Sequence, residues 1–289
     1  MGKSARPFVS LLVALAALVA AAWPGTALAA TVTQPRLGTA LNFAALGGST
    51  ITNTGPTAIT GNLGLAPGSA VTGFPPGNVA GAQHVADAVA LQAKNDLVTA
   101  YTDAVNAPTT SNLTGTNLGG RNLVPGVYSF SSSAPLTGSL TLRGNGIYIF
   151  KIGSTLVTAS NSVVNLTGGA QACAVYWQVG SSATLGSGSH LVGNLMALTS
   201  ITMVTNAQIV QGRAMARNGA LTLDGNHITA PTGTCTVPAL STTRTSVTPT
   251  VPGTGTGLVN PGRIALGVVA IFAGGLALAV GRRRTETSS

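Results

Sequence analysis

Charged side chains are scarce in this chain of 289 residues, and acidic ones are the scarcest. Only 7% of the residues are Asp, Glu, Lys or Arg, and Asp and Glu together number 5. Between residues 31 and 238, Asp224 is the only acid outside the segment 79–107. Polysaccharide-cleaving enzymes with elongated β folds use clustered carboxylates for calcium and a basic catalytic residue. The composition argues against that class of enzyme.

Other catalytic patterns are missing as well. The three histidines, His84, His190 and His227, show no metal-ligand spacing, and His227 near Asp224 is better explained as a surface hydrogen-bonding pair than as a catalytic dyad. The sequence has no G-x-S-x-G, no phosphate-binding loop and no C-x-x-C. We therefore expect a protein that is not an enzyme, with no catalytic residues, no metal site and no cofactor.

The formal charge of +9 belongs mainly to the two ends of the chain. Between residues 31 and 238 there are seven basic and four acidic residues, a net of +3. They are scattered, and aromatic residues make up 4% of the chain, so no basic stripe with interleaved aromatics predicts nucleic-acid binding. Few aromatics, 38 glycines and many Thr, Ser and Asn instead favour an all-β extracellular domain with a neutral surface. We expect a monomer.

The N-terminal residues have the order of a secretory signal peptide. Lys3 and Arg6 precede an apolar run at 8–22, and the small-residue triplet Ala27-Leu28-Ala29 follows. This order predicts a signal peptide at 1–29 and a mature chain that begins near Ala30. The alternative is an uncleaved membrane anchor.

The C-terminal residues predict display on the cell surface. Residues 239–263 are rich in Thr, Pro and Gly and are expected to form an extended stalk. An apolar stretch at 264–281 is expected to cross the membrane, and the tail at 282–289 begins with three arginines that would stay in the cytoplasm. The stalk contains a pentapeptide that resembles the x-P-x-T-G sorting signal, formed by Val251, Pro252, Gly253, Thr254 and Gly255.

The resemblance to a sorting signal implies a sortase that cleaves after Thr254 and joins the protein to the cell wall. Val251 stands where leucine is usual. The alternative is a simple C-terminal membrane anchor. Both place the domain at 30–238 outside the cell. In an exported protein, the two cysteines, Cys173 and Cys235, are expected to form a disulfide, the alternative being two unpaired buried thiols.

One segment of the domain has helical periodicity. Between 79 and 107, apolar residues recur every four positions, the spacing of one helical face: Val85, Val89, Ala93, Leu97, Tyr101 and Val105. Pro108 follows the segment. We predict one long amphipathic helix at about 79–107 that packs with this stripe against the rest of the domain.

The remainder of the domain repeats with a period of about 20 residues. GNLMA at 193–197 recurs as GRAMA at 212–216, and ATL at 183–185 recurs as ITM at 201–203 and LTL at 221–223. A threonine flanked by apolar residues predicts a strand with an outward hydroxyl and an inward hydrocarbon. Repeats of this kind favour stacked coils of a parallel β-solenoid. We expect Leu185, Met203 and Leu223 to stack inside, and Thr184, Thr202 and Thr222 to form an outward ladder.

These segments together resemble the microbial ice-binding protein family, over essentially all of residues 37–229. The resemblance rests on an ordered set of motifs: LNFAALG at 41–47, ITGNLG at 59–64, PG at 67–68, GFPPG at 73–77, LVPGVY at 123–128, YIFKIGSTL at 148–156, VYWQVGSSATL at 175–185 and AMARNGALTL at 214–223. It implies a right-handed, discontinuous parallel β-helix of triangular section with one long α-helix along it. It also implies that a flat, Thr-rich face binds ice.

Family members often carry T-A/G-x-T/N on that face, and this chain has two copies, at 158–161 and 114–117. Threonine suits such a face because it presents a hydroxyl and a methyl on a stiff side chain. Outward threonine is also simply common in strands. The candidate ice-binding residues are Thr141, Thr155, Thr158, Thr184, Thr199, Thr202 and Thr222.

The alternative function is a cell-wall adhesin or matrix protein that binds carbohydrate or other cells without ice activity. A groove lined by Trp or Tyr would favour sugar binding. Trp177 lies in an apolar strand and is expected in the core.

Overall fold

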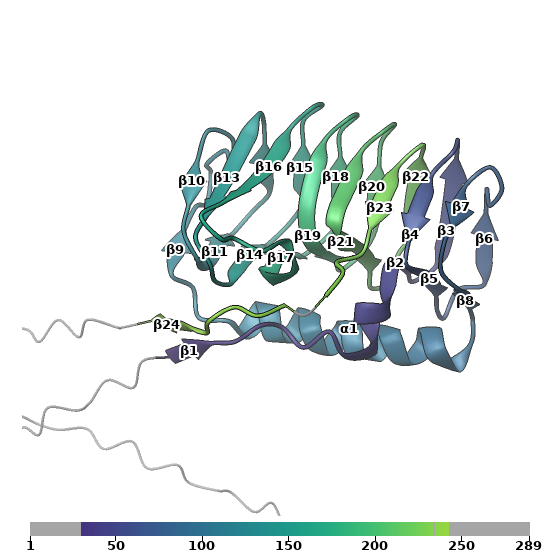
Figure 1. The fold of residues 1–289 in the computed structure, drawn as a ribbon, viewed down its shortest axis with the longest axis horizontal. Helices are drawn as coiled ribbons and strands as arrows, with labels where there is room; N and C mark the ends of the chain where they lie inside the picture. The colour runs from purple at the N-terminus through teal and green to yellow at the C-terminus, as the bar shows by residue number, and fades with distance from the viewer. Residues whose placement is uncertain (1–29, 234, 243–289) are drawn as a thin grey trace, which may run out of the picture. The chain divides into compact units, whose positions relative to one another are not determined.

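The protein folds as a parallel β-helix with a single long helix along one side (Figure 1). The computed structural model describes residues 30–233 and 235–242. The expected signal peptide, sorting motif, membrane segment and basic tail lie outside these residues. In the described part of the chain, no helix is long and apolar enough to cross a membrane.

One side of the β-helix is a seven-stranded sheet, which we call the threonine sheet. All its pairings are parallel. Its strands, in order, are β12 (Ala134–Leu136), β15 (Leu156–Thr158), β18 (Ala183–Leu185), β20 (Ile201–Met203), β22 (Leu221–Asp224), β3 (Thr50–Thr54) and β6 (Ala70–Thr72).

A 15-stranded sheet forms the other two sides, because its long strands β19 (His190–Ala197) and β21 (Gln208–Ala216) continue around a corner. On the side beneath the helix lie β9 (Ser111–Asn112), β11 (Gly126–Phe130), β14 (Tyr148–Ile152), β17 (Val175–Val179), β2 (Phe43–Gly47), β5 (Asn62–Leu65) and β8 (Gln83–Val85). On the remaining side, which we call the third face, lie β10 (Asn122–Leu123), β13 (Ser139–Arg143), β16 (Val163–Thr167), β23 (His227–Thr229), β4 (Ala58–Thr60) and β7 (Asn78–Val79).

The order of the coils is discontinuous along the chain. The last coil of the C-terminal part, with β22 and β23, pairs with the N-terminal strands β3 and β4. The N-terminal coils therefore stack on the last C-terminal coil and extend the β-helix beyond it. The mainly β, helical architecture expected from the sequence is confirmed.

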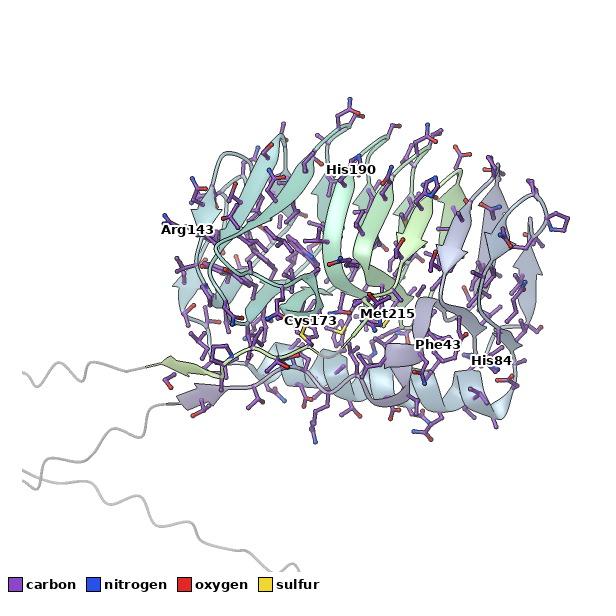
Figure 2. The ribbon with its side chains drawn as sticks, in the orientation of Figure 1. Phe43, His84, Arg143, Cys173, His190 and Met215 are labelled. Atoms are coloured by element: carbon purple, nitrogen blue, oxygen red, sulfur yellow. A yellow bond between two sulfur atoms is a disulfide. The ribbon has the colours of Figure 1, made fainter. Side chains whose placement is uncertain are left out.

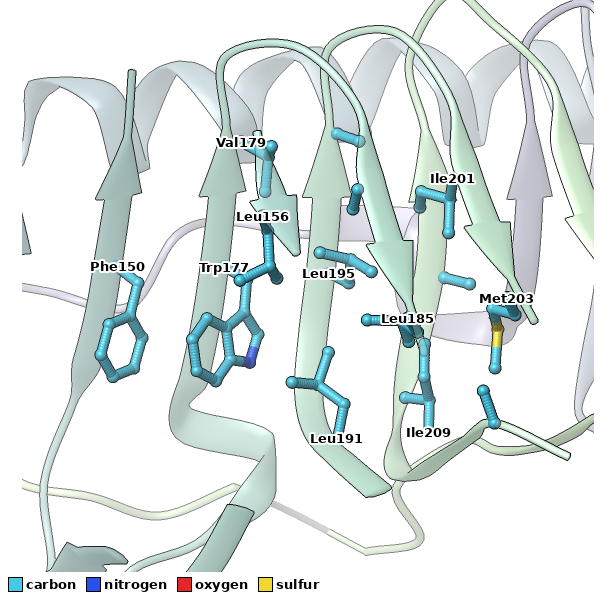
Figure 3. Packing of buried hydrophobic residues seen from close by; sticks show 14 of the residues in the cluster. Phe150, Leu156, Trp177, Val179, Leu185, Leu191, Leu195, Ile201, Met203 and Ile209 are labelled. Carbon is cyan, nitrogen blue, oxygen red and sulfur yellow. The ribbon is translucent and has the colours of Figure 1, made fainter. Parts of the chain in front are cut away.

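The interior of the solenoid is filled by stacked apolar side chains (Figure 3). Leu185, Met203 and Leu223 are at most 1% exposed and lie inside, as predicted. Trp177 is also fully buried, and its ring stacks on Phe150 with centroids 4.1 Å apart. Its expected place in the core is confirmed.

Helix α1 (Ala88–Asn106) is shorter than predicted. The segment 79–87 contains β8 and ends at Asp87, whose carboxylate accepts a hydrogen bond from the Ala90 amide at 2.8 Å. Ala86 has a φ of 53°, which an α-helix does not allow. The prediction that the helix already includes Val85 was therefore wrong, and Asp87 caps it instead. The C-terminal boundary before Pro108 agrees with the prediction.

The buried face of α1 also differs in part from the predicted stripe. Ala93, Leu97 and Tyr101 are buried, but Val89 and Val105 are 49% and 41% exposed. The helix instead buries small residues and one lysine: Ala90, Lys94, Ala100 and Ala104. These alanines let the helix lie close to the sheet, where Phe43 and Met215 contribute to the apolar layer between them (Figure 2).

The two ends of the described chain are fastened together. β1 (Ala30–Val32) pairs antiparallel with β24 (Leu240–Thr242), so the folded body continues a few residues past the expected boundary at 238. The predicted disulfide between Cys173 and Cys235 is present, with Cα atoms 5.8 Å apart. Cys173 belongs to the short helix η2 (Ala172–Ala174), and a second short helix, η1 (Gly38–Asn42), precedes β2.

Candidate functional site

Five threonines lie in one row across five adjacent strands of the threonine sheet. Thr184 pairs with Thr202, Thr202 with Thr222, Thr222 with Thr52, and Thr52 with Thr72. Their neighbours along the strands point inward, because side chains alternate between the two faces of a strand. The outward ladder expected for Thr184, Thr202 and Thr222 is confirmed.

Two members of this row, Thr52 and Thr72, were missed by the sequence analysis. They belong to β3 and β6, which precede the helix in sequence and lie beside β22 in space. The local pattern Thr50-Ile51-Thr52 carries the same alternation of hydroxyl and hydrocarbon. The discontinuous coil order hid the fact that these residues continue the ladder.

The row continues without hydroxyls in the other direction. Val157 pairs with Thr184 and is 45% exposed, and Pro135 pairs with Val157. Val157 presents methyl groups in the same register as the threonines. The row of β-branched side chains is therefore one strand longer than the row of threonines.

Small side chains flank this row. Thr155 is half-buried, and its hydroxyl lies 2.7 Å from that of Ser133. The Ser182 and Ser200 hydroxyls accept hydrogen bonds from the backbone amides of Ser200 and Ala220, at 3.3 and 3.1 Å. These hydroxyls form hydrogen bonds between neighbouring coils. Because the side chains are small, they do not project far beside the threonine row.

Thr158 does not lie on the surface. It is 3% exposed, and its hydroxyl donates to the Ser189 hydroxyl at 3.1 Å and accepts from the Gly186 amide at 2.9 Å. The expectation of an outward hydroxyl was wrong because Leu156 and Thr158 both point inward and Val157 points outward. The Thr158 hydroxyl instead connects two coils inside the solenoid.

Two other candidates lie away from the row. Thr141 belongs to β13 on the third face, where it pairs with Asn122 and Asn165. Thr199 is exposed in the connection between β19 and β20. The structure therefore brings Thr184, Thr202 and Thr222 together, with Thr155 at their flank, and leaves Thr141 and Thr199 apart.

The two T-A/G-x-T/N motifs lie at turns. Asn161 has a φ of 56°, and corresponding corners are formed by Asn206 at 62° and by Gly188 and Gly225 at 63° and 59°. Asparagine and glycine tolerate this left-handed conformation better than other residues. In the copy at 114–117, the Asn117 side chain accepts from the amides of Gly119 and Thr137. In this chain the motif stabilises corners.

The threonine sheet is nearly uncharged. Asp224 is the one charged residue in its seven strands; it lies at a corner and accepts a hydrogen bond from the Thr205 hydroxyl. The third face, by contrast, carries His190, Gln208 and His227 in register, and Arg143 projects from its β13. Helix α1 covers much of the remaining side (Figure 1). The threonine sheet is thus the open, neutral surface of the domain.

Nothing in the described residues resembles a metal centre, since no three His, Cys, Asp or Glu side chains gather there. His227 and Asp224 form no hydrogen bond or ion pair in this part of the chain, and the Asp224 carboxylate faces Thr205 instead. The threonine sheet is an extended surface.

Comparison with known proteins gives a consistent result. A model of the ice-binding-like family matches residues 45–229. An ice-binding protein of Nostoc sp. (strain HG1) is 54% identical over 196 residues, which cover 66% of this chain and 72% of that protein. An ice-binding protein of Flavobacterium frigoris (strain PS1) is 36% identical, with 70% and 78% covered.

Solved structures agree with the sequence relatives. The crystal structure of an ice-binding protein from an Antarctic biological consortium is 45% identical, with a TM-score of 0.67 over 70% of this chain and 94% of that one. That of an ice-binding protein from Antarctomyces psychrotrophicus is 40% identical, also with a TM-score of 0.67, over 70% and 100%. The matched segment contains every strand of the threonine sheet, and the chain belongs to the ice-binding-like family.

Proposed function

We propose that this protein binds ice through the threonine sheet, with the row Thr184, Thr202, Thr222, Thr52 and Thr72 as the central contact. The observation that carries the proposal is the register of these five residues on adjacent strands. The names of the relatives support ice as the partner.

The physical basis is a regular grid of identical groups. Neighbouring strands lie about 4.8 Å apart and alternate residues along a strand about 6.7 Å apart, so five threonines span roughly 19 Å. Each threonine offers a hydroxyl and a methyl, and its branched side chain has few rotamers. Water over such a row meets the same pair of groups at every step, which favours an ordered layer that can join a lattice.

Rigidity supports the same function. Inward neighbours of the row, such as Ile51, Ile201 and Leu221, are fully buried, so Thr52, Thr202 and Thr222 are held by residues packed in the core. A mobile row would lose the match to a lattice. A charged side chain would orient the water molecules around it. A neutral row imposes no such orientation on its water.

The other two sides are less suited to a lattice. The third face carries side chains of different length and chemistry. His190 and Gln208 present an imidazole and an amide, and Val210 presents a short hydrocarbon. The remaining side is occupied by α1 over much of its length. The threonine sheet alone combines openness, neutrality and repetition among the faces of the described domain.

We place this activity outside the cell. The order of basic, apolar and small residues at 1–29 supports export, and the pentapeptide at 251–255 followed by the apolar stretch at 264–281 supports anchoring through a sortase or directly in the membrane. The disulfide fits an oxidising compartment. Such a protein would hold ice at the cell surface or slow its recrystallisation.

The adhesin alternative is less favoured. The relatives are ice-binding proteins. Trp177 is fully buried, and its indole N–H donates to the Val192 carbonyl at 2.9 Å, so its ring is not available to a sugar. Among the described residues it is the only tryptophan. No aromatic side chain lies in the row or beside it on the threonine sheet.

The test compares two threonine substitutions by thermal hysteresis and by inhibition of ice recrystallisation. Thr202→Tyr places a bulky ring in the middle of the row and should abolish most of the activity. Thr141→Tyr, the matched control, places the same ring on the third face at a threonine that is also half-buried, and should leave the activity unchanged.

Both variants should melt close to the wild type, because surface substitutions usually change stability by no more than about 0.5 kcal/mol. Equal loss of activity in both variants, or loss in Thr141→Tyr alone, would show that another face binds. An inactive wild type would remove the ice proposal and leave the adhesin as the better explanation.

A further inference from the structure

A cavity of about 570 Å³ lies on the side of the domain near the disulfide, away from the threonine sheet. It is bounded by the N-terminal segment before η1, by the end of the described chain and by two strands of the 15-stranded sheet. The residues that matter for its chemistry are Gln34, Leu41, Cys173, Tyr176, Arg213 and Pro231. Its volume is within the range of about 300–1,000 Å³ usual for small-molecule sites.

Arg213 is a buried cation at this cavity. It is 4% exposed, and its Nε and Nη2 donate to the Leu41 carbonyl at 3.2 and 2.7 Å, while Nη1 donates to Oδ1 of Asn194 at 2.7 Å. Both partners are neutral. None of the described residues that line the cavity is acidic, and Arg213 forms no ion pair in the described part of the chain.

The guanidinium retains hydrogen-bonding capacity. It carries five N–H groups, of which these contacts use three, and the two that remain are on Nη1 and Nη2. Both remaining N–H groups can donate to carboxylate oxygens. A buried cation without a counter-ion is costly, and burial lowers the pKa of Arg213 to about 10.

The rest of the cavity would suit the remainder of such a ligand. The Tyr176 hydroxyl donates to Oε1 of Gln34 at 3.0 Å, which leaves the phenol oxygen able to accept one hydrogen bond. Leu41, Pro231 and the disulfide supply apolar wall. The cavity therefore combines two arginines, Arg213 without an ion pair and Arg36 paired with Asp103, with hydrocarbon and sulfur surface.

We propose that this cavity binds a small organic monocarboxylate, with the carboxylate paired to Arg213 and a short apolar group against Leu41, Pro231 and the disulfide. The site is separate from the threonine sheet, and the proposal does not depend on ice binding.

The first test is titration calorimetry of the mature protein with benzoate, and with benzamide as a neutral molecule of the same shape. Benzoate should bind saturably at millimolar concentrations and raise the melting temperature, and benzamide should bind at least about tenfold more weakly. The absence of saturable benzoate binding, or equal binding of benzamide, would overturn the proposal.

Variants separate the charge from the fold. Arg213→Met should abolish benzoate binding, but it also removes the bonds to the Leu41 carbonyl and can destabilise the protein. Gln34→Glu avoids this difficulty, because a carboxylate still accepts from the Tyr176 hydroxyl and supplies a negative charge in the cavity that Arg213 also lines. It should raise the melting temperature without ligand and weaken benzoate binding by at least about tenfold.

Gln208→Glu is the matched control, since it introduces the same carboxylate at a half-buried glutamine on the third face. Its benzoate affinity should equal that of the wild type. If Gln34→Glu binds benzoate as tightly as the wild type, or if Gln208→Glu weakens binding to the same extent, Arg213 does not bind the carboxylate and the proposal fails.

Discussion

We expect the buried Lys94 to make the stability of the domain depend on pH. It lies on the buried face of α1, is 7% exposed, and donates hydrogen bonds to the carbonyls of Ala216 and Arg217. No carboxylate pairs with it among the described residues. Burial, and then the charge of Arg217, lower the pKa of the Lys94 ammonium from 10.5 to about 7.

The sign of the effect follows from proton binding. Between pH 7 and 10.5 the unfolded chain keeps a proton on Lys94 that the folded protein has lost, so the free energy of unfolding rises with pH in this window. At about 1.4 kcal/mol per pH unit, the full difference is roughly 5 kcal/mol. Between pH 7 and 9, where the folded lysine is still partly titrating, the gain is about 2 kcal/mol.

The measurement is urea unfolding at pH 7, 8 and 9 for the wild type and for Lys94→Met, which keeps most of the length of the side chain without its charge. The wild type should gain about 2 kcal/mol over this range relative to the variant. The range stops at pH 9 because burial raises the pKa of Tyr148 to about 12, so ionisation of the unfolded tyrosine removes stability at higher pH.

Lys151→Met is the matched control. Lys151 also donates to a carbonyl, that of Ala107 at 2.8 Å, but it is only half-buried, and burial lowers its pKa less. Its substitution should change the pH slope less than that of Lys94. If Lys94→Met retains the slope of the wild type, the buried ammonium is not its source and the reasoning is wrong.

Two further predictions concern the row and the disulfide. Val157→Thr adds a hydroxyl to an exposed position in register with Thr184, so it should increase thermal hysteresis; unchanged activity would place Val157 outside the ice contact. The disulfide joins residues separated by 62 positions, and in the chain-entropy model its removal by Cys173→Ser with Cys235→Ser should cost about 4 kcal/mol, measured by urea unfolding. Mass spectrometry should find neither cysteine of the native protein alkylated without reductant; labelling of both would contradict the pairing.

The solenoid could be predicted because its period is local. Each coil repeats a short strand in which one apolar residue points inward on either side of an outward one, and Ile201-Thr202-Met203 shows the pattern within three residues. Since coils stack on their neighbours, the repeat also predicted the register of Thr184, Thr202 and Thr222.

Thr158 shows how a shift of one residue defeats the same reasoning. Leu156-Val157-Thr158 has its apolar residue where Ile201 stands in β20, so its outward residue is Val157 and Thr158 takes the inward position of Met203. A slip of one residue moves every side chain to the other face of a strand. The interior accepts the threonine because Ser189 and the Gly186 amide satisfy its hydroxyl.

The pairing of strands far apart in the chain could not be predicted from the local sequence pattern. Thr222 and Thr52 are neighbours on the sheet although 170 positions separate them in the chain. Nothing within either strand specifies that partner. The family resemblance implied the discontinuity, but the residues that it would bring together could be identified only from the register.

Three of the basic residues have the same kind of position and the same kind of partner. Lys94, Lys151 and Arg213 all donate to backbone carbonyls, and all three lie on the strands beneath α1 or on α1 itself. There they fasten the helix and the N-terminal segment to the coils, at the cost of burying charge. None of the strands of the threonine sheet carries a basic residue. A cation there would orient the water around it and interrupt the repeat of hydroxyl and methyl groups. The basic residues that fasten the helix and the N-terminal segment are thus kept away from the surface proposed to meet ice.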